Sequence, residues 1–217
     1  MRPMSTTSQP PGKPNRMGEA TRAKIIDAAI AVLAEKGFSG FTLQAVADRA
    51  DVVYGNLTHH YPSRDKLVEA MLEAILDRYR ARFDALAASL DGAGDSQIRN
   101  LVTWLIDDSI DPETAPVFLE LWAMATHNAK VAEGLAGLYD GAVEICMRSL
   151  GVSPRSAKAR RLRDSLYVLG TVLEGNSSIF YNRPRGGEIY EGFRREAIDI
   201  LVSVLDQRLA EAKDDPP

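Results

Sequence analysis

The sequence has one cysteine, Cys146, among 217 residues. A single cysteine excludes an internal disulfide and a cysteine-based zinc site, and it is typical of a reducing compartment. Cys146 lies between Ile145 and Met147 in an apolar helical stretch, so we interpret it as a small buried hydrophobic residue. Only three histidines are present, and no cluster of possible ligands has the spacing of a metal site. We therefore expect no metal ion and no other cofactor.

Long hydrophobic runs are also missing. Charged residues such as Asp27, Glu35, Asp107 and Asp108 interrupt every apolar stretch before it reaches the roughly 20 residues of a membrane-spanning helix. Residues 1–18 contain prolines and basic side chains but lack the apolar stretch of about 7 to 15 residues in a secretory signal. We therefore expect a folded cytoplasmic protein with a flexible basic arm at residues 1–18 and no contact with a membrane.

Patterns typical of enzymes and of β-structure are absent as well. The sequence shows no Ser-His-Asp or Cys-His set, no paired carboxylates and no phosphate-binding glycine loop. No segment alternates apolar and polar residues as a strand does, while the apolar fraction of 45% is enough to bury a core. We expect an all-α protein that is not an enzyme. The alternative is an enzyme or ligand carrier in the helical body, with the N-terminal part as an interaction module.

Charge is distributed unevenly along the chain. Residues 1–66 hold nine Lys+Arg against six Asp+Glu, a net charge of +3, whereas residues 67–217 carry −7, which together give the formal −4. A basic N-terminal part on an acidic body is expected if only the first part meets phosphate groups.

What is present is a run of helical patterns that begins after the arm. Apolar residues at i, i+3, i+4 and i+7 predict a helix over residues 21–36, which Gly37 can terminate. Thr42 has the hydroxyl and the position of an N-cap for a second helix, which ends near Ala50. A helix of two turns is unstable alone, so it must pack against its neighbours.

A third short helix is predicted over Tyr54–Tyr61, where Pro62 stops it. Ser63 caps a fourth helix that continues to about Ser89, and the segment Asp91–Gly94 breaks it. Further helices are predicted at residues 96–109, 112–127, 129–150 and 188–212, with a long helix from Ser153-Pro154 to the loop at 182–187. We expect three parts: the arm at 1–18, a helix-turn-helix domain at 19–66 and a helical body at 67–212.

Two short helices braced by a preceding helix form the helix-turn-helix arrangement, whose second helix enters the major groove of DNA. The helical pattern turns Val46, Ala47, Val52 and Leu57 inward, together with His60 and Tyr61. The outward groups can bond bases, and hydroxyls with the free N–H groups at the start of the fourth helix can bind phosphate. The candidate DNA-binding residues are Thr42, Gln44, Tyr54, Gly55, Asn56, Thr58, His59, Ser63, Arg64 and Lys66.

The segment Ala47–Leu67, ADRADVVYGNLTHHYPSRDKL, resembles the signature of the tetracycline-repressor (TetR) family. With the preceding helix, the match covers roughly 50 residues and is specific. The resemblance implies an all-helical homodimeric repressor with a small-molecule pocket in the body and its last two long helices paired at the dimer interface. The segment Phe118–His127 is similar to the body of regulators of betaine synthesis, which does not define the effector.

Four residues depart from the family pattern. Asp51 replaces the usual glycine of the turn, and Asp tolerates the left-handed region better than most residues do. Val53 replaces the Ser or Thr cap of the recognition helix, at a cost of about 1 kcal/mol. Thr58 replaces a tyrosine that contacts phosphate, and Arg64 replaces a lysine. These changes concern operator strength more than the class of activity.

His59 and His60 raise the alternative of a metal site. Neighbouring helical residues point about 100° apart, and no partner cluster accompanies them, so we favour DNA contact for His59. His127 is interpreted as a polar group at a helix end.

Large side chains recur at helical spacing throughout the body. Most would be core residues, but the resemblance implies that some line a ligand cavity, with Glu174 and Asn176 as its polar groups. The candidate pocket residues are Phe83, Trp104, Phe118, Trp122, Tyr139, Tyr167, Glu174, Asn176 and Phe180.

The apolar stripes Leu162–Phe180 and Ile189–Leu205 allow two interpretations. They could close the core of one monomer, or they could form a two-fold interface. We favour the interface, because a homodimer would hold two recognition helices roughly 34 to 36 Å apart and bind a palindromic operator of double-stranded DNA. An unidentified small-molecule effector would then act by changing that separation through the fourth helix.

Overall fold

The computed structural model describes residues 16–90, 97–155, 159–184 and 186–213. Every regular element in those ranges is a helix, which confirms the all-α prediction. The helices are α1 (Arg16–Gly40), α2 (Leu43–Arg49), α3 (Tyr54–His60), α4 (Arg64–Leu90), α5 (Gln97–Asp108), α6 (Ala115–Ala125), α7 (Ala129–Ser149), α8 (Arg160–Phe180) and α9 (Glu188–Lys213).

The ends of α1 differ from the prediction in an informative way. The helix begins at Arg16, five residues before Thr21, so the last residues of the expected arm are helical. Gly37 has φ 63°, a left-handed conformation that ends the regular helix where the sequence predicts, and a further short helical turn follows it. Residues 1–15 of the arm, the break at 91–94, Arg185 and the tail from 214 lie outside the described residues.

The start of α8 corrects a prediction. Ser153-Pro154 does not open this helix, which begins at Arg160. Gly151 has φ 74°, and the Val152 N–H donates to the Met147 carbonyl at 2.9 Å, which closes the end of α7. The Arg163 guanidinium then donates to the Pro154 carbonyl. A hydrogen bond from Arg163, nine positions later, therefore holds Pro154 in the connection, against its local preference for a helix start.

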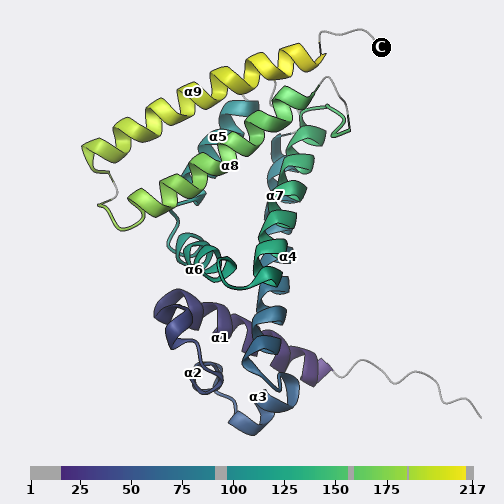
Figure 1. The fold of residues 1–217 in the computed structure, drawn as a ribbon, viewed down its shortest axis with the longest axis vertical. Coiled ribbons are helices and arrows are strands. Elements are labelled where there is room, and N and C mark those ends of the chain that lie inside the picture. The colour runs from purple at the N-terminus through teal and green to yellow at the C-terminus, as the bar shows by residue number, and fades with distance from the viewer. Residues whose placement is uncertain (1–15, 91–96, 156–158, 185, 214–217) are drawn as a thin grey trace, which may run out of the picture.

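Helices α1, α2 and α3 form a head at one end of the molecule, and α4 runs from the head into the body (Figure 1). In the body α4 packs along α7, while α8 and α9 lie side by side at the far end. Helix α6 lies between the head and α8 and packs against α1 (Figure 1). None of the described helices is both long and apolar enough to cross a membrane.

Two clusters of buried side chains hold the chain together. The first joins the head to α6 and the adjoining parts of α4 and α7, and it includes Phe41, Leu57 and Leu121. The second lies farther along the body, between α4, α5, α7, α8 and α9, and it includes Met147 and Leu162. The apolar core therefore continues across the expected domain boundary at residues 66 and 67 without a break.

Candidate functional site

The turn between α2 and α3 is built from local hydrogen bonds. The Ala45 N–H donates to the Thr42 hydroxyl at 3.0 Å, so Thr42 is the N-cap of α2, as expected. Asp51 has φ 49°, the left-handed conformation predicted for this position. The Val52 N–H then donates to the Ala47 carbonyl at 3.1 Å. Val53 makes no side-chain cap to α3, which agrees with the predicted loss.

Helix α3 presents the surface that the sequence assigned to DNA. Leu57 is completely buried beneath it, whereas Tyr54, Gly55, Asn56 and His59 are exposed. A Cβ atom added to Gly55 would meet no atom within 4 Å, so packing within the chain does not require glycine at this position. These exposed groups form an open face that a nucleic-acid groove can reach.

Two candidate contacts are held by their own helices. The Thr58 hydroxyl donates to the Gly55 carbonyl at 3.2 Å, and the side chain is half-buried. The Gln44 amide donates to the Asp48 carboxylate at 2.7 Å. Gln44 must exchange this partner before it can bond a base, whereas Thr58 keeps an oxygen lone pair for a further donor.

The start of α4 differs from the expected anion site in one residue. Ser63 accepts from the Lys66 N–H at 3.2 Å and caps the helix, as predicted. Arg64, however, does not face outward. Its guanidinium lies 3.8 Å from the centre of the Phe38 ring and donates to the Phe38 carbonyl. Arg64 therefore braces the head from within, because its guanidinium stacks on the Phe38 ring and donates to the Phe38 carbonyl, although its buried Nε has no hydrogen-bond partner among the described residues.

Lys66 remains near the surface with a partner. Its ammonium lies 2.8 Å from the Glu69 carboxylate, to which Lys130 also donates. Hydrogen bonds from Lys130 and Lys66 lower the pKa of Glu69 to about 2. A phosphate group that binds Lys66 would therefore compete with an exposed ion pair.

The predicted inward position of His60 and Tyr61 is reached only in part, because both are half-buried. Partial burial, and then the nearby Arg22 charge, lower the pKa of His60, whose Nδ1 accepts from the Arg22 Nε at 3.5 Å. Within the described ranges, no three His, Cys, Asp or Glu side chains gather as metal ligands would.

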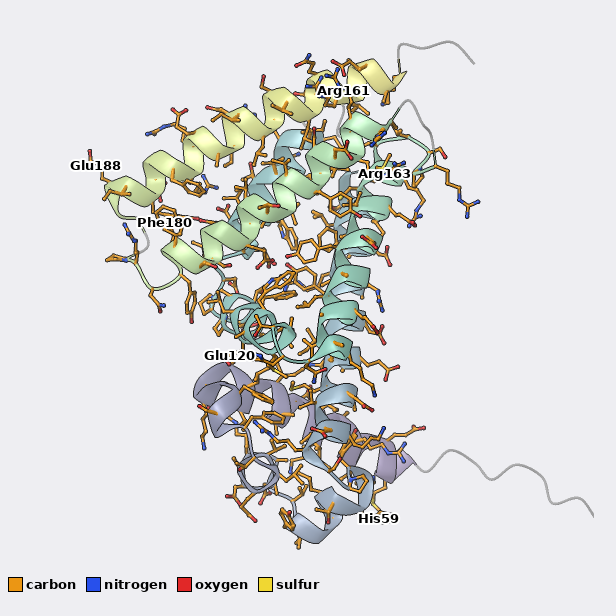
Figure 2. The ribbon with its side chains drawn as sticks, in the orientation of Figure 1. His59, Glu120, Arg161, Arg163, Phe180 and Glu188 are labelled. Atoms are coloured by element: carbon orange, nitrogen blue, oxygen red, sulfur yellow. The ribbon has the colours of Figure 1, made fainter. Side chains whose placement is uncertain are left out.

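A hydrogen bond to a carboxylate of α6 joins this helix to the head, and no feature of the sequence predicted it. Glu120 accepts from the Phe38 N–H at 2.9 Å (Figure 2 labels Glu120). Gly37 leaves room for this contact, because a Cβ atom there would lie 3.0 Å from the Glu120 Oε1. The Phe38 peptide is therefore held at its N–H by Glu120 and at its carbonyl by Arg64. Helix α6 and the start of α4 are linked through one residue of the head.

We predict that Glu120→Ala will lower the free energy of unfolding by about 1–2 kcal/mol, because the Phe38 N–H loses its acceptor in a partly buried place. Urea unfolding followed by circular dichroism measures the change. Glu120→Gln keeps an acceptor oxygen and is the matched control. Equal stability of the alanine and glutamine variants would show that this hydrogen bond does not stabilise the fold.

The body contains a narrow cavity between α4, α5, α6, α7 and α8. Its volume is about 50 Å³. Side chains fill the surrounding space between α6, α7 and α8 (Figure 2). The cavity is lined by Tyr79, Phe83, Leu105, Ser109, Thr114, Phe118, Leu138, Tyr139, Ala142, Leu173, Glu174 and Ser177.

Four of the nine candidate pocket residues line this cavity: Phe83, Phe118, Tyr139 and Glu174. The other five lie elsewhere, for reasons of packing. Trp104 packs against Phe83, Trp122 packs against Tyr139 and hydrogen-bonds Glu174, and Phe180 packs on Tyr190 and Phe193. Tyr167 is 39% exposed and donates to Asp140, while the buried Asn176 amide donates to Ser109 and the Ile106 carbonyl.

Several lining residues were missing from the sequence prediction. Tyr79 is at an inward position of α4, and its hydroxyl donates to Asp108 at 2.8 Å. Asp108 is buried and also binds the Arg82 guanidinium, which donates to Thr114 at 3.2 Å. Burial and the Asp108 charge raise the pKa of Tyr79 well above its ordinary value, so its hydroxyl stays a donor. Helical spacing could suggest Tyr79, but small lining residues such as Ser177 give no such signal.

Glu174 is the acidic group of the cavity. Burial raises the pKa of its carboxyl group to about 7, and a hydrogen bond from the Trp122 side chain opposes that shift. Burial disfavours the charged form of a carboxyl group unless a cation compensates it.

Helices α8 and α9 bury the stripes that were expected to pair two subunits. Leu162, Leu166, Leu205 and most other members belong to the core of the single chain. The sequence therefore identified the monomer's core face, and the opposite faces carry exposed apolar residues. These are Val168 (57% exposed), Ile179 (57%), Ile189 (68%), Ile200 (59%) and Val204 (37%). All five lie within the ranges Leu162–Phe180 and Ile189–Leu205 that were expected to form the interface.

Comparison with known proteins agrees with the helix-turn-helix geometry of the head. Residues 25–71 match the profile of "Bacterial regulatory proteins, tetR family". An uncharacterised HTH-type transcriptional regulator of Xanthobacter autotrophicus is 29% identical over 69% of this chain and 75% of its own length. The HTH-type regulator BetI of Burkholderia thailandensis is 34% identical over 51% of this chain. The alignment spans 57% of BetI.

Solved structures share the fold over most of the chain. A TetR-family regulator of Mesorhizobium loti superposes with a TM-score of 0.70 at 15% identity, covering 89% of this chain and 96% of that one. The multidrug-binding protein EbrR, complexed with malachite green, superposes with a TM-score of 0.63 at 22% identity, covering 84% and 96%. With the matched helix-turn-helix segment and this architecture, the chain belongs to the TetR family of HTH-type transcriptional regulators.

Proposed function

We propose that this protein is a ligand-responsive repressor that binds a palindromic DNA operator in the cytoplasm as a homodimer and leaves it when a small molecule occupies the body. The observation that carries the proposal is the open face of α3, where Tyr54, Gly55 and Asn56 are exposed above the buried Leu57. Side chains that do not pack in the core can bond base edges without lowering the stability of the fold.

Each candidate DNA-binding residue has a role in this proposal. Tyr54, Asn56 and Gln44 read bases, while Gly55 lets the backbone approach closely. Phosphate contacts come from Lys66 and from a group of hydroxyl and imidazole side chains. This group is Thr42, Thr58, His59 and Ser63. Arg64 acts indirectly, because its place on Phe38 sets the angle between α4 and the rest of the head.

The body supports the remaining parts of the proposal. The exposed apolar faces of α8 and α9 are suited to a two-fold interface, because a second copy would cover the same residues on both subunits. The cavity is the proposed effector site. It is lined mainly by apolar side chains with a few polar ones, as small-molecule sites are. EbrR, which has the same fold, is a multidrug-binding protein.

Coupling between the two ends follows from shared helices. Helix α6 carries both Phe118, in the cavity wall, and Glu120, which holds the head. Helix α4 carries Phe83 at the cavity and begins at Arg64 beside the recognition helix. A ligand that displaces α6 or α4 would thereby change the separation of the two heads in a dimer. In this proposal residues 19–66 bind DNA, and residues 67–212 bind the effector and form the dimer.

The direct test is an electrophoretic shift with the DNA upstream of the protein's own gene. Tyr54→Ala and Asn56→Ala are each expected to weaken specific binding about tenfold, the usual value of a lost base contact. Circular dichroism melting should be unchanged, because both residues are exposed. Ala136→Asp, at an exposed position of α7, is the control. Wild-type affinity in both variants would misplace the recognition surface, and no shift that survives competitor DNA would reject the repressor.

A further inference from the structure

The cavity contains one acidic side chain in an otherwise neutral wall that includes four aromatic rings. Among the described residues that line it, Glu174 is the only carboxylate, and no lysine, arginine or histidine is present. On the basis of the proposed effector role of this cavity, we propose that the effector is an organic cation. Its positive charge lies beside the Glu174 carboxylate, and its apolar part lies among the surrounding rings.

The two acidic side chains near the cavity differ in their partners. Asp108 is buried but satisfied, because it binds the Arg82 guanidinium and accepts from the Tyr79 hydroxyl at 2.8 Å. Among the residues that the structure describes, Glu174 has no such cation, and its carboxyl group is hydrogen-bonded by the Trp122 side chain. A buried carboxylate is unfavourable until an opposite charge arrives. Only Glu174 therefore leaves a charge for a ligand to complement.

The rings around Glu174 suit the same ligand class. Tyr79, Phe83, Phe118 and Tyr139 all line the cavity. Tyr79 packs against Phe118 with ring centres 4.8 Å apart and against Phe83 at 5.5 Å. Aromatic faces attract cations and exclude water, and this attraction is strongest for cations that are weakly hydrated, such as quaternary ammonium groups. An anion would meet both the ring faces and the carboxylate, which repel it.

The size of the cavity limits the ligand and indicates what must move. A second cavity of about 40 Å³ adjoins the first, and both are lined by Phe83, Tyr139 and Leu173. Tyr139 packs on Gly170, where a Cβ atom would lie 3.0 Å from its ring. Rotation of Tyr139 or Phe83 would merge the two spaces. The two spaces are small, so even a cation with one aromatic ring requires a change of side-chain rotamer, and a larger one would also displace helices.

Binding of a permanent cation should depend on pH in a defined direction. The pKa of Glu174 is raised to about 7 by burial, so the carboxyl group is mostly neutral in the free protein below that pH. Cation binding favours the ionised form, and affinity should rise as pH increases through 7. The other groups that face Glu174 are Tyr79 of α4, Trp122 of α6 and Tyr139 of α7. Burial raises the pKa of Tyr79 well above its ordinary value, so its hydroxyl keeps its proton in this range.

The test compares two probes of equal shape, phenyltrimethylammonium and tert-butylbenzene, by isothermal titration calorimetry with the full chain. At pH 8 the wild-type protein should bind the cation about tenfold more tightly than the neutral probe. Lowering the pH to 6 should weaken cation binding and leave the neutral probe unchanged. Glu174→Gln should remove both the preference and its pH dependence. Glu144→Gln, an exposed carboxylate on α7, is the matched control.

The outcomes separate this inference from the proposed function. Equal binding of both probes to the wild type, or a preference that survives Glu174→Gln, would overturn the cation proposal and leave the cavity as an effector site for neutral molecules. Loss of both probes in Ala142→Phe, which fills the shared wall, would place them in the cavity. Failure of the cation to bind at all would reject the inference, while operator binding would test the repressor independently. Thermal melting of each variant verifies that it is folded.

Discussion

Shortening Phe41 to alanine is expected to lower the free energy of unfolding by about 3–5 kcal/mol, because the ring is completely buried and leaves a cavity. Phe41 lies in the core shared by the head, α6 and α7. The Arg64 guanidinium lies 5.9 Å from its ring centre, so the substitution also loosens the residue that braces the head. Urea unfolding followed by circular dichroism measures the loss.

Hydrogen exchange distinguishes a shared core from two separate domains. If the core is continuous, Phe41→Ala should reduce protection in α6 as well as in α2, because both elements pack into the same cluster. Tyr54→Ala, which removes an exposed aromatic ring, is the control and should change stability little. Unchanged protection of α6 would show that the head unfolds independently of the body.

Placing aspartate at both Val168 and Ile200 is expected to convert the proposed dimer to a monomer. Operator binding should weaken by about a hundredfold or more. A two-fold interface contains each substituted residue once in each subunit, so it would bury every new charge in two copies. The two side chains are 57% and 59% exposed in the single chain, so the fold should tolerate the change. Sedimentation at micromolar concentration measures the oligomeric state, and an electrophoretic shift measures operator affinity.

Ala136→Asp adds the same charge to an exposed position of α7 and should leave both measurements unchanged. A wild-type protein that sediments as a monomer would reject the paired-helix interface. So would a Val168→Asp, Ile200→Asp variant that remains dimeric.

Local chemistry explains why the sequence could determine the head. Caps and turns depend on residues within a few positions of each other, so the hydroxyl of Thr42, the left-handed Asp51 and the Ser63 cap could all be recognised without a structure. The exposed face of α3 follows from the helical period once Leu57 is assigned to the core.

Tertiary structure decided the features that depend on partners far along the chain. Helical spacing shows that one face of α8 or α9 is buried, but it does not say whether the same chain or a second copy covers it, and here the same chain does. Arg64 turns toward Phe38, which lies 26 positions earlier, and Glu120 reaches the same residue from 82 positions away. The cavity likewise needs five helices, so its small lining residues have no signal in the sequence.

The sequence by itself therefore determined the all-α class and the exposed face of α3, because both are encoded in local periodicity and capping, and the segment at residues 47–67 indicated the family by its resemblance. Only the tertiary structure decided where the core of the head ends, which faces of α8 and α9 remain apolar and exposed, and which carboxyl group lacks a cation. These properties depend on what each helix packs against, and packing between distant segments is set by the shape of the whole fold.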